Sequence, residues 1–519
     1  MVRGAPSPAP SRGNVRHSEN HRTSATQLVS LFALPLLVLA SAACSGGNVK
    51  TIVVTPSSKK IDNGSTLQLV ATATFRDGTT EDISATAEWS SSDPLVATVA
   101  SSGLVTAGLP GSVTITASAE GASGSASLSV AGFMPVQKTL LDAPSGYVDQ
   151  PVVAMDGAGR LLVAYGISEP SYPFRTAKTG TEWPPVWTGE NSGVTDAWPT
   201  SGADVEMASN ATGIAGMVYR RRASPSASSA DFYSIGVAYH DLTGWRWVTP
   251  LQGSLLLQWG QEPRTPVVEV DPAGTIFVAY QDATPTYALD TLAVARFGPA
   301  GLIDVTRFSE KVGRIYVAAN DAGQVMVLNT LTGSRVFDGG QWGDLKPFTV
   351  NIADNARLTL FETGSAMLLV FDEADVHFAF DGSSWSAGER LNGFDGGGGS
   401  GATDATGRAV VAWGESTGMK ARVFDGASWG DPVTIEANRV GNPSVVTNGS
   451  GTFVVLWDIP FVAIRGTWFD GVWHHPANVL PSGVFLPMVK MRSGGRIAIV
   501  HDDAAVYDSL FAWSVELRP

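Results

Sequence analysis

Six polar residues occupy the same place in a repeated pattern, each of them directly after a short apolar run. They comprise four carboxylates, one guanidinium and one amide: Arg220, Gln281, Asp372, Glu415, Asp458 and Asp502. Side chains of these types can hold a glycan or a protein surface through hydrogen bonds and ion pairs. Their shared position makes them candidate ligand-binding residues. The alternative interpretation is that they are solvated loop residues.

The other residues that could do chemistry form no known catalytic pattern. The sequence has no His-Glu-x-x-His, no Gly-x-Ser-x-Gly, no phosphate-binding Gly-Lys-Ser/Thr and no Asp-x-Asp-x-Asp-Gly calcium loop. His474 and His475 are adjacent, so on a strand they would point to opposite faces and would not share a metal. The glycines after Asp395 precede no helix that could bind phosphate. Arg220–Arg222 could clamp a carboxylate or sulfate, or form a solvated loop. We expect no catalytic residue, no cofactor and no metal.

A repeat in the last two thirds of the chain must position the six candidates. A glycine precedes each of eight apolar runs, as Gly407 precedes RAVVAW, at spacings of 54, 61, 49, 41, 43, 44 and 44 residues. The eight copies begin at Gly159, Gly213, Gly274, Gly323, Gly364, Gly407, Gly451 and Gly495. Units of about 40 to 50 residues are typical of the four-stranded blades of a β-propeller. The pattern predicts eight blades, or seven if one degenerate copy, the second, is not a full blade.

A second signal recurs downstream of four of these glycines. It is Phe-Asp-Gly followed by a tryptophan, at Asp338 with Trp342, Asp381 with Trp385, Asp425 with Trp429 and Asp470 with Trp473. Asp-Gly between apolar runs predicts a tight hairpin turn, and the tryptophan is expected to plug the start of the outer strand. The signal resembles the Asp-box repeat of sialidase-type propellers, which implies the propeller fold. Aspartate and glycine are adjacent here, so no catalytic residue is carried over. We interpret these aspartates as turn residues, against a catalytic or metal-binding alternative.

The connections within each predicted blade differ in length. Turns between first and second strands are short, whereas the connections between second and third strands are long at Gly166–Phe174, Arg220–Phe232 and Gln281–Leu292. Long loops gathered on one face of a repeat protein predict the binding face. The run Val136–Leu141 resembles the strand after each tryptophan. We expect it to complete the last blade and thereby to remove the open sheet edges.

Residues 1–43 are predicted to be a signal peptide. A basic segment precedes the apolar run Leu28–Ala40, which is too short to cross a bilayer comfortably. Small residues then lead to Cys44, the only cysteine of the chain. This arrangement resembles the lipobox of bacterial lipoproteins, which implies lipidation at Cys44 and a lipidated tether over residues 44–49. The alternative is ordinary signal cleavage that leaves an unpaired thiol.

Residues 50–131 are predicted to form a separate β-sandwich, because short alternating strands are separated by turn signals such as Asp77-Gly78. The stretch DGTTEDISATAEWSSSDPLVATVASSGLVTAGLPGSVTITA resembles the bacterial Ig-like group 2 (Big2) domain. That resemblance implies an envelope or extracellular spacer without enzyme chemistry. Trp89 is expected to be a core residue rather than a platform for a ligand. Gly132–Pro135 is then a short linker to a propeller over residues 132–519.

These observations predict an all-β protein in which an Ig-like β-sandwich precedes a seven- or eight-bladed propeller. The formal charge is −14, so nucleic acid is not an expected partner. We expect a lipoprotein anchored in the bacterial cell envelope, at the outer membrane or cell surface. Its function would be binding or scaffolding, with a glycan or an envelope protein as partner of the long-loop face. A propeller glycosidase or polysaccharide lyase is the second hypothesis, and a purely structural role is the third.

Overall fold

The computed structural model describes most of the chain after the predicted leader. The described residues are 48–142, 151–166, 174–182, 186–191, 205–222, 233–241, 243–248, 266–282, 291–350, 356–371, 375–391, 398–438, 441–459, 463–481, 488–492, 494–502 and 509–518. Their regular structure is entirely β, which confirms the all-β prediction. Within these ranges no helix is long and apolar enough to cross a membrane.

The first part of the described chain is a β-sandwich. Its strands are β1 (Val49–Thr55), β2 (Ser58–Asp62), β3 (Thr66–Gln68), β4 (Val70–Phe75), β5 (Thr80–Asp82), β6 (Glu88–Ser91), β7 (Ala97–Val99), β8 (Leu104–Ala107), β9 (Gly111–Ala119) and the first half of β10 (Ala122–Asp142). Alternate residues of these strands, such as Val105 and Ile115, form one apolar core that also includes Leu69 between β3 and β4. Trp89 packs against this core and donates its indole N–H to the carbonyl of Ser84 at 2.9 Å. The predicted core role of Trp89 is therefore confirmed.

The rest of the described chain forms eight antiparallel sheets, or blades; seven consist of consecutive strands, and β10 completes the eighth. Blade 1 is β11 (Val152–Met155), β12 (Leu161–Gly166), β13 (Phe174–Thr179) and β14 (Trp187–Asn191). Blade 2 is β15 (Val205–Ser209), β16 (Ala215–Arg222), β17 (Tyr233–Asp241) and β18 (Gly244–Val248). Blade 3 is β19 (Val267–Val270), β20 (Ile276–Gln281), β21 (Thr291–Gly298) and β22 (Gly301–Ser309). Blade 4 is β23 (Ile315–Ala319), β24 (Val325–Asn329), β25 (Gly333–Asp338), β26 (Gln341–Trp342) and the added β27 (Lys346–Pro347).

The second half of the ring repeats the pattern. Blade 5 is β28 (Ala356–Leu360), β29 (Ala366–Phe371), β30 (Asp375–Phe380) and β31 (Glu389–Arg390). Blade 6 is β32 (Ser400–Thr403), β33 (Ala409–Glu415), β34 (Gly418–Phe424) and β35 (Val433–Glu436). Blade 7 is β36 (Pro443–Thr447), β37 (Phe453–Ile459), β38 (Ala463–Phe469) and β39 (Ala477–Pro481). Blade 8 is β40 (Met488–Met491), β41 (Arg496–Asp502), β42 (Leu510–Arg518) and the second half of β10.

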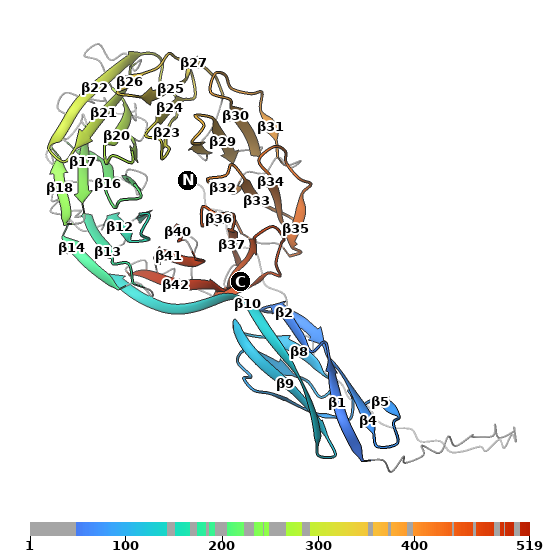
Figure 1. Ribbon diagram of the computed structural model, residues 1–519. Helices are drawn as coiled ribbons and strands as arrows, with labels where there is room; N and C mark the ends of the chain where they lie inside the picture. Colours follow the sequence, from blue (N-terminus) through green and yellow to red (C-terminus); the bar gives the residue numbers. More distant parts are fainter. Residues whose placement is uncertain are drawn as a thin grey trace, which may run out of the picture. The chain divides into compact units, whose positions relative to one another are not determined.

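The first strands of the blades form a closed ring. Each contacts the first strand of the next blade, in the order β11, β15, β19, β23, β28, β32, β36, β40, and β40 contacts β11 again. Figure 1 shows the sheets arranged around this ring. The arrangement is that of an eight-bladed β-propeller, and the second copy of the repeat is a full blade. Second strands such as β33 are buried along most of their length because neighbouring blades cover both faces of the sheet.

The turn before each second strand explains the repeated glycine. All eight anchor glycines have φ between 78° and 105°, a conformation that favours glycine. In six copies the residue three places before the glycine is an aspartate or asparagine. Its side chain accepts a hydrogen bond from the backbone N–H of the residue four places after it, as Asp404 does from Arg408 at 3.0 Å. Two of these side chains also join blades. Asn210 donates to the carbonyl of Asp271 in blade 3, and Asn320 donates to that of Phe361 in blade 5, each at 2.9 Å.

The aspartates of the Phe-Asp-Gly signal serve the outer turns. Asp381 accepts the N–H groups of Ser383 and Ser384, both at 2.8 Å, and these bonds lower the pKa of its carboxyl to about 2. The residues on either side of the turn pair, because Phe380 bridges Trp385 and Phe424 bridges Trp429. The observed geometry agrees with the predicted turn role of the aspartate and with the predicted packing role of the tryptophan.

Strand β10 continues from the sandwich into the propeller (Figure 1). Its first half pairs with β9 of the sandwich, and its second half pairs with β42 as the outermost strand of blade 8. The prediction that an N-terminal strand completes the last blade is confirmed. The linker predicted at Gly132–Pro135 is wrong, because Gly132 to Pro135 pair with Arg518 to Val515 as regular strand residues.

Candidate functional site

The first strands present alternate residues to the centre of the ring. A turn residue stands three places before each anchor glycine. We number the positions of each first strand by counting back from this turn residue. Two places back stand Ala154, Ala208, Glu269, Ala318, Thr359, Ala402, Val446 and Lys490. Four places back stand Val152, Glu206, Val267, Tyr316, Arg357, Ser400, Ser444 and Met488. Because side chains alternate along a strand, these two sets share one side of each first strand. On β19 and β40 the intervening residues are buried, whereas Glu269 and Lys490 are only half-buried.

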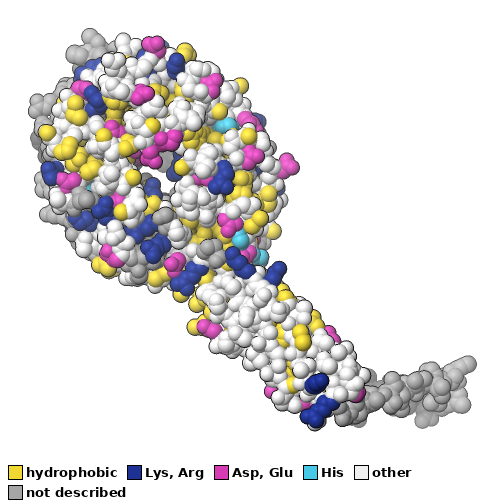
Figure 2. All heavy atoms as spheres, viewed as in Figure 1, with side chains coloured by type: hydrophobic (Ala, Val, Ile, Leu, Met, Phe, Trp, Pro, Cys, Tyr) yellow, Lys and Arg dark blue, Asp and Glu magenta, His cyan; other side chains and the backbone are white. Residues whose placement is uncertain are grey.

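Four of these side chains carry charge, and we call them the channel tetrad: Glu206, Glu269, Arg357 and Lys490. They come from blades 2, 3, 5 and 8, so residues far apart in the sequence converge on the axis of the ring. Figure 2 shows a hollow at the centre of the ring with acidic and basic side chains at its border. Glu206 and Arg357, nearer the start of their strands, are exposed, whereas Glu269 and Lys490 lie deeper. The tetrad therefore forms an outer and an inner level of the channel.

The tetrad is coupled electrostatically across the ring. Burial, together with the charge of Arg357, lowers the pKa of Lys490 to about 8, although Glu269 and Glu206 act in the opposite direction. Burial raises the pKa of Glu269 to about 7, against a hydrogen bond from the N–H of Val270 and the charge of Lys490. Burial also raises the pKa of Glu206 and lowers that of Arg357. Protein atoms thus surround side chains that still meet solvent, which is expected inside an open channel.

The directions of these shifts show that the tetrad is not a set of salt bridges. A direct ion pair lowers the pKa of the acid, as the bonds from Arg296 do for Asp304 in blade 3. The shifts of Glu269 and Lys490 have the opposite sign. Among the described residues, no ion pair within 4.0 Å joins members of the tetrad. Glu269 and Lys490, the two half-buried members, are therefore partly desolvated without forming an ion pair with each other, and this arrangement costs stability.

This cost predicts how a Lys490→Met variant behaves. The folded-state pKa of Lys490, about 8, lies below its ordinary value of 10.5, so the wild-type protein gains stability as the pH rises between these values. Below pH 8 the penalty of the charged amine is fully present. We expect Lys490→Met to melt at a higher temperature than wild type at pH 7 and to lose this advantage by about pH 10.5. Thermal melts at the two pH values test this, and a variant that is less stable at pH 7 would contradict it.

The residues predicted from the sequence lie at the ends of second strands, one strand outward from the channel tetrad. Arg220, Gln281, Glu415, Asp458 and Asp502 lie at or near the ends of β16, β20, β33, β37 and β41. Asp372 is outside the described residues, as are Asp395 and most of the three long loops. Of the side chains that the structure describes in this set, those of Glu415 and Asp458 form no hydrogen bond or ion pair with each other.

Three of these candidates are buried or take part in local hydrogen bonds. Gln281 is 6% exposed. Glu415 accepts the indole N–H of Trp413 at 2.9 Å and faces Lys420 at 3.9 Å. The carbonyl of Asp458 accepts the N–H of Gly441 at 3.0 Å. Sequence reasoning missed the tetrad, although a charged residue two or four places before the turn residue is a signal that could have found it.

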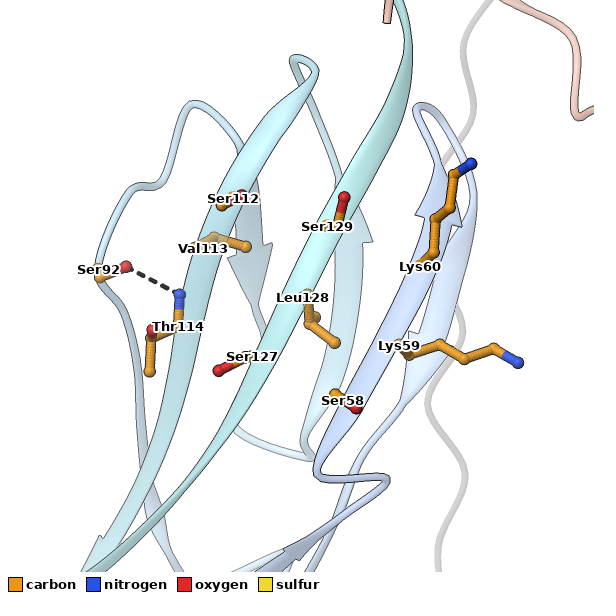
Figure 3. Close-up of a pocket in the computed structure, with 10 residues that line it drawn as sticks. All are labelled: Ser58, Lys59, Lys60, Ser92, Ser112, Val113, Thr114, Ser127, Leu128 and Ser129. Atoms are coloured by element: carbon orange, nitrogen blue, oxygen red, sulfur yellow. Dashed lines mark hydrogen bonds between the residues drawn. The ribbon is translucent and has the colours of Figure 1, made fainter. Parts of the chain in front are cut away.

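The sandwich carries a shallow groove with a volume of about 620 Å³ over β2, β9 and β10. Serine and threonine side chains line most of it, and Ser92 accepts the backbone N–H of Thr114 at 2.9 Å. Figure 3 shows Lys59 and Lys60 pointing away from these hydroxyls. The groove therefore presents an open hydroxyl-bearing surface rather than an enclosed site.

Two further cavities lie between neighbouring blades near the glycine turns. One, of about 290 Å³ between blades 1 and 2, includes Asp156 and Arg160, which are paired with each other. The other, of about 360 Å³ between blades 5 and 6, includes His377, which accepts the indole N–H of Trp429 at 3.2 Å. No group of three or more histidine, cysteine, aspartate or glutamate residues in the described ranges could hold a metal ion. Neither cavity contains a member of the channel tetrad.

Comparison with known proteins identifies one part of the chain. Residues 48–130 match the bacterial Ig-like domain of group 2 and form such a domain. Ice-binding protein 1 of Shewanella frigidimarina is 38% identical over 112 residues in this region, which cover 19% of this chain and only 12% of that protein. These findings indicate a bacterial surface or extracellular protein.

Two solved structures resemble the chain remotely. A protein of unknown function from Dyadobacter fermentans is 12% identical with a TM-score of 0.37, covering 75% of this chain and 100% of its own. The NanB sialidase from Streptococcus pneumoniae is also 12% identical, with a TM-score of 0.33, covering 62% of this chain and 67% of its own.

Proposed function

We propose that this chain is a lipid-anchored binding protein of the bacterial cell envelope. Its propeller would bind a glycan or a protein at the channel mouth, on the face of the long second-to-third loops. The observation that carries the proposal is the channel tetrad. Its two half-buried members, Glu269 and Lys490, have pKa values that burial shifts from their ordinary values, and groups with shifted pKa values gather at functional sites.

The two levels of the tetrad support binding from the long-loop face. Each first strand runs from that face towards the glycine turn, so Glu206 and Arg357 stand nearer the mouth than Glu269 and Lys490. Exposure falls in the same direction, from the outer pair to the inner pair. A ligand entering here would meet one acid and one base at each level.

The binding role is tested by thermal-shift measurements on the full chain with envelope glycans, other polysaccharides and short peptides. A ligand present at a hundred times its Kd stabilises the folded state by about 2.7 kcal/mol. We expect one class to raise the melting temperature of wild type but not that of the Glu206→Gln, Arg357→Gln double variant. Binding that the double variant retains fully would place the ligand elsewhere and contradict the proposal.

The lipid anchor is tested by a Cys44→Ser variant expressed in a bacterial host. Several acyl chains on one residue give a stable membrane anchor, whereas a serine cannot be lipidated on sulfur. We expect wild type in the detergent-rich phase of a phase separation and Cys44→Ser in the aqueous phase. A Ser45→Ala variant is the control and should behave as wild type. Equal partition of Cys44→Ser and wild type would contradict lipidation.

Catalysis by a propeller glycosidase or polysaccharide lyase is the second candidate, because of one specific observation. The pKa values of Glu206 and Glu269, on neighbouring blades, are both raised by burial, and a carboxyl group with a raised pKa can act as a general acid. Turnover of a polysaccharide by wild type but not by Glu269→Gln would favour this function. Binding without turnover would favour the binding role.

A further inference from the structure

His474 lies where the sandwich meets the propeller, within the single compact unit Asn48–Pro519. Its Nδ1 atom is 3.1 Å from a carboxylate oxygen of Asp62, the last residue of β2 in the sandwich. Its Nε2 atom is 3.0 Å from a carboxylate oxygen of Asp470, in the outer turn of blade 7. One imidazole ring therefore connects two carboxylates, one in the sandwich and one in the propeller.

These two contacts determine the charge of the ring. An ionised carboxylate only accepts hydrogen bonds, so each of the two ring nitrogens must carry a hydrogen. A neutral imidazole has one N–H, whereas the imidazolium has two. The ring also stacks on the indole of Trp468, with the centroids 4.2 Å apart and the planes inclined by 10°. The face of an indole attracts a cation, so both observations assign the imidazolium form to His474.

The surroundings of the ring are acidic on both sides. Asp62 and Asp470 face its two nitrogens, and His475 adjoins it in the chain. His475 donates its backbone N–H to the second carboxylate oxygen of Asp62 at 3.0 Å. Arg465, on β38 of the same blade, pairs instead with Glu436 of blade 6 at 3.2 Å. The charge of the imidazolium is thus the one that the two aspartates share.

We propose that His474 is a pH-sensitive lock between the sandwich and the propeller. When the ring loses its proton, one nitrogen presents a lone pair to a carboxylate, and attraction becomes repulsion. The side chain of His474 is only 12% exposed, so water has little access to replace the lost partner. Strand β10 still joins the two domains, so the junction loosens without separating. Histidine side chains change charge between about pH 5 and pH 8. The lock does not involve the channel and is independent of the proposed function.

The test is hydrogen exchange of the full chain at about pH 5.5 and about pH 8.5, on either side of the range in which histidine titrates. The N–H of His475 reports on the junction because it bonds to Asp62 across the two domains. We expect its protection factor, which corrects for the intrinsic effect of pH on exchange, to be at least about tenfold lower at the higher pH. The N–H of His474 bonds to the carbonyl of Trp468 within blade 7 and should keep its protection. Equal protection of the His475 amide at both pH values would overturn the proposal.

Two neighbouring variants decide whether the imidazole of His474 causes the change. His474→Gln has no titratable ring, so the amide of residue 475 should be equally protected at both pH values. His475→Gln is the matched control, because it removes the adjacent imidazole and keeps the backbone N–H that bonds to Asp62. It should show the full pH dependence of wild type. A pH dependence that His474→Gln retains would assign the effect to another group and overturn the lock.

Nitrogen-15 NMR of the wild-type chain with labelled histidine measures the charge of the ring itself. At about pH 5.5 both nitrogens of His474 should carry a hydrogen, and one of these hydrogens should be lost over the same pH range as the protection of the His475 amide. A ring that carries a single hydrogen while this amide stays protected would overturn the proposal, because the contact would then not need the imidazolium.

Discussion

Replacing Phe133 by alanine is expected to lower the free energy of unfolding by about 3 to 5 kcal/mol. Phe133 lies on β10 at the point where the chain enters blade 8, and its side chain is fully buried. Its ring contacts that of Trp468 in blade 7 edge-on, with the centroids 5.5 Å apart. The substitution leaves a cavity between β10 and the neighbouring strands of blades 7 and 8. Urea denaturation followed by tryptophan fluorescence measures the loss.

Leu140→Ala is the matched control for this prediction. Leu140 is on the same strand but is 53% exposed, so its truncation should change the free energy of unfolding by less than about 0.5 kcal/mol. A loss for Phe133→Ala as small as that for Leu140→Ala would mean that β10 packs only loosely on the ring. It would contradict the conclusion that this strand closes the propeller.

Replacing Asp404 by alanine is expected to lower the free energy of unfolding by about 3 kcal/mol or more. The side chain is almost fully buried in the glycine turn of blade 6. It accepts N–H groups from Thr406 at 2.9 Å and Arg408 at 3.0 Å, and it pairs with the guanidinium of Arg408 at 2.9 Å. Alanine leaves these donors without a partner. Thermal and urea unfolding of the full chain measure the effect.

Two comparisons separate this turn from an ordinary surface turn. Asp404→Asn keeps an oxygen acceptor for the N–H groups and should lose less stability than Asp404→Ala. Asp425→Ala lies in the same blade, in the exposed outer turn, where Asp425 accepts the N–H groups of Ala427 and Ser428. Asp425→Ala should also lose less stability than Asp404→Ala. If Asp425→Ala proved as destabilising as Asp404→Ala, burial would not explain the importance of the glycine turns.

Much of the fold follows from local signals in the sequence. The anchor glycines mark a left-handed backbone position, and each begins a buried second strand. The repeated tryptophans follow turns whose aspartates fix the backbone. The closing strand was predictable because a ring of blades removes open edges only if the two ends of the repeat share one sheet. The continuous strand was not predictable, because Gly132 and Pro135 are typical of a linker.

The channel tetrad could not be predicted in the same way. Val267–Val270 and Met488–Met491 each contain a single charged residue in an apolar strand, a pattern that usually indicates a residue facing solvent at the molecular surface. Only the closed ring brings Glu269 and Lys490 from distant blades to one axis. The candidates at the ends of second strands were chosen because these ends adjoin the predicted long-loop face. Second strands, however, lie outside the first strands that line the channel. The predicted ligand role of these candidates stays a prediction.

A crystal structure of the full chain grown with a ligand found by the thermal-shift measurements tests the central claim most directly. We predict density for the ligand at the channel mouth, within hydrogen-bond distance of Glu206 or Arg357. An empty channel in which Lys490 and Glu269 pair directly would contradict the account. The tetrad would then be a structural element of the propeller, and the binding site would have to be sought on another face.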